Sequence, residues 1–210
     1  MRGARWPRTS DREPEHQHPS YYSGADNPHD VAVVVLDKPV KGATARIAPL
    51  GLLDTMKAAG TLNQSTAFTS VGYGSQETKP PHGWGVPGSS FTYLDTREWA
   101  IGYFNSLGKG YMTISQNLNA GSGGTCYGGS GRPQFLGGTD SNLQVSVTVT
   151  GDVFCKSTNK VQRLDIFSVQ SWLSQFGVLG YSTRKRGWGG RAPHPRCVDT
   201  VLPRCTVSRG

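Results

Sequence analysis

Glycine and proline interrupt this chain so often that it has little room for long helices. The sequence holds 28 glycines and 13 prolines among 210 residues, well above the roughly 12% that the two make up in an average protein. They follow no collagen-like period. Such an excess favours many turns between short strands, and the length suits one domain or two small subdomains that share a core.

Between these turns lie short runs of β-branched or alternating apolar residues. The expected strands are 30–36, 67–74, 90–98, 111–117, 133–136 and 143–150. Residues 41–65 predict an irregular connection. Apolar residues at mostly three- and four-residue spacing predict one helix over 161–176, ended by Gly177. No apolar run approaches the roughly 20 residues of a membrane helix, so we expect no membrane span.

The positive charge is concentrated at the C-terminal end. The formal net charge is +8, and residues 181–210 hold seven basic residues against one acidic residue. We therefore expect 178–210 to be a basic disordered tail, which is either a solvated segment or a weak contact for polyanions through 181–210. Residues 1–18 are polar and unpatterned, and we expect them to be unstructured. The body between them is close to neutral, so its function is not electrostatic.

Three segments, in this order and spacing, resemble the chymotrypsin/trypsin-like serine peptidases. The first is His29-Asp-Val-Ala-Val-Val-Val-Leu36, which is similar to the strand that opens with the triad aspartate. The second is Cys126-Tyr-Gly-Gly-Ser-Gly-Arg-Pro133, which is similar to the loop of the nucleophilic serine. The third is Cys155 followed by 161–173, which matches the second pocket cysteine and the C-terminal helix. A glycine-ended strand, Val71-Gly-Tyr-Gly74, also resembles one between the first two segments, so the resemblance covers roughly residues 19–177.

The resemblance implies an all-β, trypsin-like double β-barrel with its first barrel truncated, plus a C-terminal helix. Residues 19–60 would be the remnant of the first barrel, and residues 61–177 the second barrel with the helix. The implied function is that of a serine endopeptidase, which hydrolyses peptide bonds through an acyl-enzyme and needs no metal or organic cofactor. Its partner would be a protein or peptide substrate, and we expect a monomer.

The roles of individual residues follow from the same resemblance. Ser130 matches the nucleophile and Asp30 the carboxylate that orients the histidine, while the backbone N–H groups of Gly128 and Ser130 match the oxyanion hole. Taken alone, Asp30 reads as a polar residue at the start of a strand, and the glycine-dense stretch reads as a flexible linker.

The specificity pocket of the family is also matched. Gly124 and Thr125 correspond to substrate-binding positions, and Gly124 carries no charge, so we expect an apolar or small substrate side chain. Cys126 and Cys155 match the disulfide beside the pocket, which implies a secreted protein although this chain shows no signal peptide. Counting alone leaves three pairings of the four cysteines open.

The remaining two cysteines lie in the basic tail. Cys197 and Cys205, together with His194, are too weak a pattern to predict a metal site.

The chain departs from the family where the catalytic base should be. None of the 29 residues before Asp30 resembles the family's Ala-His-Cys segment. His29 adjoins Asp30, so in a strand the two side chains point to opposite faces. Gly129 and Arg132 replace an aspartate and a small residue on either side of Ser130.

These departures leave three hypotheses. In the first, the chain is an endopeptidase domain without its N-terminal part, inactive as written because the base is missing. In the second, it is a non-catalytic homologue that acts as a binding module. In the third, it binds polyanions through the basic tail.

Overall fold

A computed structural model describes residues 15–22, 29–39, 41–77 and 91–178. The described part is mostly antiparallel β-structure with two short α-helices. The strands are β1 (Glu15–Gln17), β2 (Ala32–Val34), β3 (Arg46–Ile47), β4 (Ala67–Gly72), β5 (Gln76–Glu77), β6 (Phe91–Thr92), β7 (Glu98–Leu107), β8 (Tyr111–Ser115), β9 (Pro133–Leu136), β10 (Leu143–Gly151) and β11 (Thr158–Arg163). The helices are α1 (Leu52–Ala58) and α2 (Phe167–Leu173), with 3-10 turns η1 (Leu118–Ala120) and η2 (Ser174–Phe176). Within this part, no helix has the length and apolar character needed to cross a membrane.

Six strands form a closed antiparallel barrel. Their order is β11-β8-β7-β4-β9-β10, and pairing between β10 and β11 closes the ring. β3 joins β10 from outside the ring as a short parallel neighbour. The expectation of an all-β fold is therefore confirmed, and the predicted strands at 67–74, 111–117, 133–136 and 143–150 correspond to β4, β8, β9 and β10.

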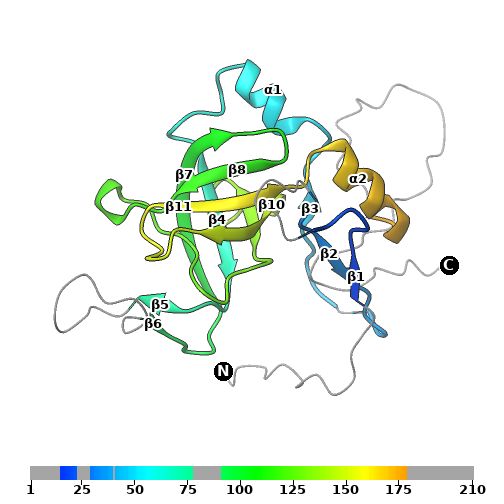
Figure 1. The fold of residues 1–210 in the computed structure, drawn as a ribbon, viewed down its shortest axis with the longest axis horizontal. Coiled ribbons are helices and arrows are strands. Elements are labelled where there is room, and N and C mark those ends of the chain that lie inside the picture. Colours follow the sequence, from blue (N-terminus) through cyan, green and yellow to red (C-terminus); the bar gives the residue numbers. More distant parts are fainter. Residues whose placement is uncertain (1–14, 23–28, 40, 78–90, 179–210) are drawn as a thin grey trace.

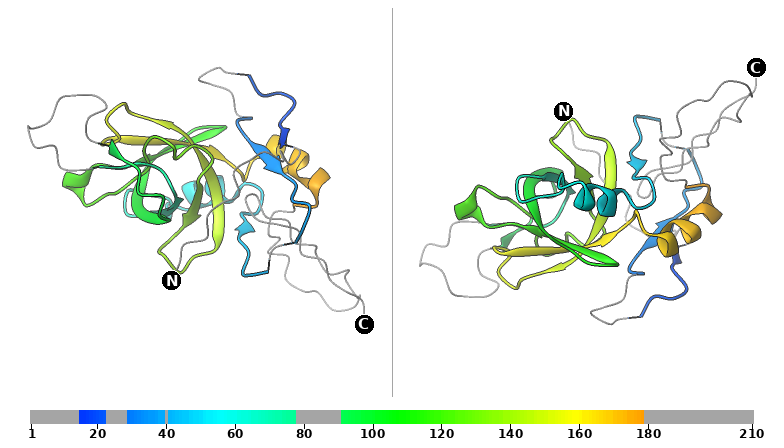
Figure 2. Two further views of the ribbon diagram at one scale, coloured as in Figure 1. Left: turned by 90° about the horizontal axis from the view of Figure 1, so that it is seen from below. Right: turned by 90° about the horizontal axis from the view of Figure 1, so that it is seen from above.

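A second, smaller unit lies beside the barrel. It consists of the two-stranded sheet β1–β2 and helix α2, which stand together to one side of the barrel in all views (Figures 1 and 2). β1 falls within the segment 1–18 for which the sequence predicts no regular structure. Its backbone pairs with β2, for example His16 with Val33, so this strand exists through a partner distant in sequence.

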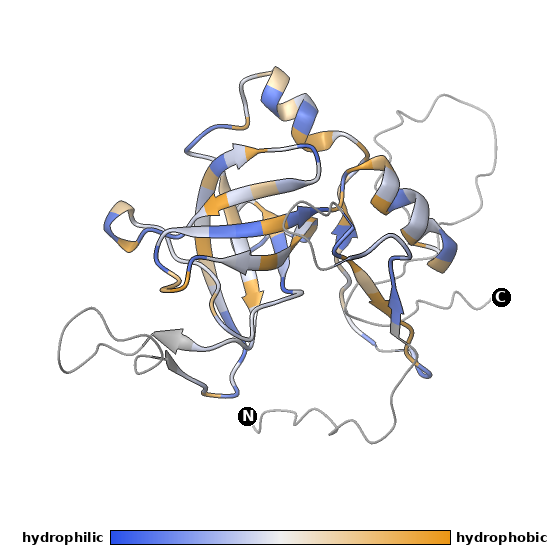
Figure 3. Ribbon diagram, in the orientation of Figure 1, coloured by the Kyte–Doolittle hydropathy of each residue, from blue (hydrophilic) through white to orange (hydrophobic). Residues whose placement is uncertain are grey.

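Two apolar clusters hold these parts together. The first joins the barrel strands to α1, which lies at one end of the barrel (Figure 1); its buried members are Ala48, Leu53, Leu62, Phe68, Phe104, Met112, Ile114, Val145 and Val161. The second joins β2 and α2 to the barrel wall; its buried members are Val31, Val33, Ile47, Leu164, Val169, Trp172, Leu173 and Val178. Val178, placed by the sequence at the start of the tail, is thus part of the core. Along the barrel strands, apolar and polar stretches alternate (Figure 3), as expected of strands with one buried face.

Other elements besides β1 also differ from the sequence prediction. The helix expected over 161–176 is wrong in its first part, because 161–163 belong to β11: Val161 and Gln162 pair with both β8 and β10, and Arg163 pairs with β10. The strand expected over 90–98 is also wrong: β6 and β7 are separated by residues that include Asp95 in the left-handed region, at φ 52°. Within 41–65 the structure adds α1, whose Leu53 N–H donates to Asp165 Oδ2 at 2.8 Å.

Candidate functional site

The segment from Cys126 to Arg132 forms two successive tight turns. Gly129 N–H donates to Cys126 O at 2.8 Å, and Arg132 N–H donates to Gly129 O at 3.1 Å. Gly128 and Gly131 each take the third position of their turn. Both adopt left-handed φ values, of 76° and 78°, a conformation that favours glycine. This double turn exposes Ser130 at its outer surface.

The barrel fixes both ends of this double turn. Gly131 N–H donates to Thr148 O of β10 at 2.8 Å, and Thr148 N–H returns a bond to Arg132 O at 2.9 Å. At the other end, Ser75 N–H donates to Tyr127 O at 2.9 Å. The disulfide Cys126–Cys155, expected from the resemblance, is present in the structure.

The two expected oxyanion donors are free of other bonds. Within the part of the chain that the structure describes, neither Gly128 N–H nor Ser130 N–H donates to a backbone or side-chain acceptor. A side chain at Gly128 is disfavoured by its left-handed φ of 76°, and its Cβ would lie 2.5 Å from the hydroxyl of Tyr93, an exposed side chain that would have to move. At Gly129, the position of the family's aspartate, a Cβ would lie 2.6 Å from Cys126 O.

Asp30 and Ser130 line the same cleft. This cleft, of about 560 Å³, lies between the smaller unit and the barrel, and residues of β1, β2, α2 and β10 line it. Asp30 lies two residues before β2, and its N–H donates to Gln162 Oε1 at 3.2 Å. Its carboxylate accepts no hydrogen bond from the described residues, and partial burial raises its pKa above the ordinary value. The shared cleft places these two groups, far apart in sequence, on one surface.

No histidine of the described part lines this cleft. His18 is buried: its ring stacks on His29 at 4.5 Å, and its Nδ1 accepts a bond from Ser20 N–H at 3.1 Å. Burial, and then the nearby His29, lower the pKa of His18. His16 contacts Phe176 at 5.0 Å between ring centres. These three imidazoles therefore pack around α2 and the start of β2 rather than beside Ser130.

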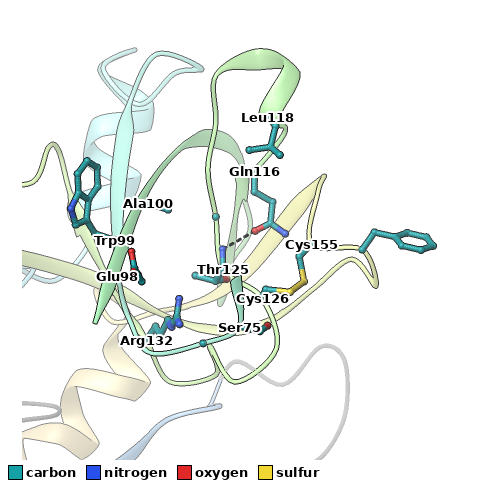
Figure 4. A pocket seen from close by; sticks show the side chains of 13 residues that line it. Ser75, Glu98, Trp99, Ala100, Gln116, Leu118, Thr125, Cys126, Arg132 and Cys155 are labelled. Carbon is teal, nitrogen blue, oxygen red and sulfur yellow. Dashed lines mark hydrogen bonds between the residues drawn. A yellow bond between two sulfur atoms is a disulfide. The ribbon is translucent and has the colours of Figure 1, made fainter. Parts of the chain in front are cut away.

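Gly124 and Thr125 line a second cavity, of about 250 Å³, on the barrel (Figure 4). The side chain of Gln116 packs against Gly124, and a Cβ added at Gly124 would overlap it. Gln116 Oε1 also accepts the Thr125 N–H at 3.0 Å. Cys126 and Cys155 form part of the same wall.

The sequence does not predict that the Arg132 side chain lines this cavity. Its side chain enters between the strand of Trp99 and the loop of Thr125 (Figure 4). An added Cβ at Gly72 or at Gly74 would overlap the guanidinium or its stem. The glycines of the motif 71–74 therefore make the space that Arg132 occupies, which only the folded chain brings together.

Comparison of the sequence with protein-family models gave no match, and comparison with curated proteins gave none either. The sequence pattern of His194, Cys197 and Cys205 was too weak to predict a metal site. These residues lie outside the described part of the chain, as does most of the basic tail.

Proposed function

We propose that this chain is a serine endopeptidase domain of the trypsin-like family, with a truncated first barrel, and that it lacks the general base. Ser130 is the nucleophile, Asp30 the orienting carboxylate, and the N–H groups of Gly128 and Ser130 the oxyanion donors. One observation carries the proposal: Ser130 and Asp30, which are far apart in sequence, line one cleft between the small unit and the barrel. The Cys126–Cys155 disulfide supports an extracellular setting.

The chemistry defines what this chain does and what it lacks. The Ser130 oxygen would bond to the substrate carbonyl carbon, and the negative charge on the carbonyl oxygen would be stabilised by the two N–H groups. The hydroxyl proton must pass to a base, and no described histidine lies in the cleft. The cleft would therefore bind a peptide, with the acyl-transfer step limited by proton removal.

An external base tests this assignment. Labelling of Ser130 by a fluorophosphonate should be slow in buffer and should accelerate in proportion to added neutral imidazole, because imidazole can take the hydroxyl proton. Ser130→Ala should abolish labelling. Asp30→Asn should reduce the imidazole-dependent rate, because the carboxylate no longer stabilises the imidazolium. Ser106→Ala is the matched control, since Ser106 is an exposed serine of β7 outside the cleft.

Two outcomes would overturn the proposal. Fast labelling without imidazole would mean that the chain already holds a base. Labelling that persists in Ser130→Ala, or that Ser106→Ala removes, would mean that Ser130 is not the nucleophile.

A non-catalytic binding module is the second candidate. Gly129 and Arg132 favour it, because an added Cβ at 129 would lie 2.6 Å from Cys126 O and because Arg132 places a cation beside the double turn. It predicts that the folded chain binds peptides but that no concentration of imidazole produces labelling. The polyanion hypothesis rests on 181–210, and unchanged heparin retention after deletion of this segment would dispose of it.

A further inference from the structure

The backbone bends sharply at Asp30, just before β2 begins. Val31 N–H donates to His29 O at 2.8 Å, which closes a three-residue turn around Asp30. Asp30 does not have a positive φ, so this is an inverse γ-turn, a form that is common at the ends of strands. The position of Asp30 in the cleft therefore depends on what holds this bend.

Gln162 holds the bend from within the barrel wall. Its side chain is fully buried, and its Oε1 accepts the Asp30 N–H at 3.2 Å. On its other side, Nε2 donates to Gly110 O at 2.9 Å and to Arg163 O at 3.1 Å. Exchange of the amide oxygen and nitrogen would set a donor against the Asp30 N–H and an acceptor against two carbonyl oxygens. The partners therefore fix the orientation of this amide.

The other contacts of the smaller unit leave it more freedom. Val31 and Val33 belong to the apolar cluster that joins this unit to α2 and the barrel, and apolar contacts have no preferred direction. The Gln162 amide is different, because moving it would leave buried donors without acceptors, which costs free energy. This hydrogen bond fixes one point of the bend, which apolar packing alone does not do.

The same two strands also hold Ser130. Gln162 stands on β11 opposite Val147 of β10. Thr148, the next residue of β10, accepts a backbone bond of 2.8 Å from the residue after Ser130. Val147 and Thr148 both line the cleft. Asp30 and Ser130 are therefore fixed to neighbouring positions of one strand pair, although neither residue belongs to it.

We propose that Gln162 is a positioning residue, which places Asp30 relative to Ser130 whenever the smaller unit lies against the barrel. Gln162 does not itself line the cleft, so it acts through the backbone of Asp30. The inference rests on the proposed function, which gives Asp30 and Ser130 their roles.

Fluorophosphonate labelling with and without imidazole tests this role. Gln162→Met keeps nearly the same side-chain volume and removes both the acceptor and the donors. The imidazole-dependent rate should fall about three- to tenfold, as expected when a hydrogen bond that holds the carboxylate in place is lost. The slow rate in buffer alone should stay unchanged, because the turn of Ser130 keeps its bonds to β10. In the Asp30→Asn background, Gln162→Met should cause no further loss.

Gln144→Met is the matched control. Gln144 is a buried glutamine of β10 that does not line the cleft. Its replacement removes a buried amide from the adjacent strand and should leave both labelling rates unchanged. An equal loss of rate in both variants would mean that Gln162 stabilises the barrel without positioning Asp30.

A second readout does not depend on the reaction. Partial burial raises the pKa of Asp30, and a bend released from Gln162 would expose the carboxylate to water. Carboxyl-carbon NMR titration should therefore give a lower pKa for Asp30 in Gln162→Met than in the unsubstituted chain, whereas Gln144→Met should leave this pKa unchanged.

The unsubstituted chain decides the matter if Gln162→Met does not fold. A scalar coupling across the hydrogen bond should join the Asp30 nitrogen to the side-chain carbonyl carbon of Gln162, and its absence would overturn the proposal.

The positioning role and the proposed function can fail separately. If Asp30→Asn slows the imidazole-dependent rate and Gln162→Met does not, the positioning role is wrong and the proposed function stands. If Asp30→Asn has no effect on this rate, the proposed function is wrong, and the pKa of Asp30 in Gln162→Met then decides by itself whether Gln162 positions Asp30.

Discussion

At the scale of single residues, the contact between Arg132 and two glycines sets the character of the candidate site. Arg132 Nε and Nη2 are buried without hydrogen-bond partners, which costs free energy that other interactions must offset. The space that the guanidinium needs comes from Gly72 and Gly74, at the end of β4. Neither glycine has a left-handed backbone. Glycine is therefore needed at these positions to make room for the Arg132 side chain and not to form a turn.

A double-mutant cycle measures this dependence. Gly72→Ala should destabilise the protein by about 1–3 kcal/mol, because the new methyl group overlaps the buried Arg132 side chain. In an Arg132→Ala background the same change should be neutral or slightly stabilising, since alanine is the less flexible residue in the unfolded chain. Urea unfolding of the four chains gives the coupling energy. Gly138→Ala, in the turn between β9 and β10, should show no coupling to Arg132, and equal costs of Gly72→Ala in both backgrounds would contradict the packing described above.

At the scale of elements, the loop between β10 and β11 is organised by one carboxylate. Burial alone would raise the pKa of Asp152, but its oxygens accept bonds from Lys156 N–H at 3.0 Å and from Thr158 N–H and Ser157 N–H at 2.8 Å each, and from Gln116 Nε2 at 3.3 Å. Together these donors lower its pKa to about 2. The loop carries Cys155, so this carboxylate also positions one half of the disulfide.

The lowered pKa gives a pH dependence with a definite sign. Because the folded pKa of Asp152 is about 2 and the ordinary value is 3.8, the ionised group stabilises the fold fully above pH 3.8 and loses this effect as the pH falls through 2. Because solvent screens this partly exposed carboxylate, Asp152→Asn should lower the free energy of unfolding at pH 7 by about 1–2 kcal/mol. The difference from wild type should shrink between pH 4 and 2, as followed by urea unfolding across this range. Asp140→Asn, at an exposed turn residue, is the control, and a cost for Asp152→Asn that stays constant with pH would contradict the ionised role.

The elements also show what the sequence could and could not predict. Strands β4, β8, β9 and β10 follow from alternation of apolar residues, which depends on each strand alone. Helix α1 was missed because its first turn is bonded by Asp165, which is distant in sequence. The start of α2 was misplaced because Val161 suits both a helix face and a buried strand, and closure of the barrel decides between them.

The candidate site divides in the same way. The pairing of Cys126 with Cys155 was expected from the resemblance, which matches each cysteine within a local motif, whereas the double turn at Ser130 is known only from the structure. The cavity of Arg132 was not, since it depends on where β4 places Gly72 and Gly74 relative to a loop about 60 residues later.

At the scale of the whole molecule, the disulfide ties the serine loop to the loop between β10 and β11. Its two cysteines are 29 residues apart in sequence, and a cross-link of this span restricts the unfolded chain by about 3–4 kcal/mol. Reduction should therefore lower the Tm by about 10 °C. Thermal unfolding with and without a phosphine reductant measures this effect.

The control for this prediction isolates one disulfide. The chain with Cys197→Ser and Cys205→Ser keeps Cys126 and Cys155 and should respond to reductant as wild type does. The chain with Cys126→Ser and Cys155→Ser should not respond. A Tm that reductant leaves unchanged in the first chain would mean that this bond does not stabilise the fold.

The closed ring has a consequence for how long each side of the cleft keeps its shape. Every barrel strand has a neighbour on both sides, so its amide protons exchange with solvent only when the ring opens as a whole. β1 and β2 pair only with each other among the described residues, and their amides exchange through brief local opening. Ser130 thus sits on the long-lived wall of the cleft and Asp30 on the short-lived one. The distance between Ser130 and Asp30 therefore changes whenever β1–β2 opens, while the barrel wall beside Ser130 keeps its shape.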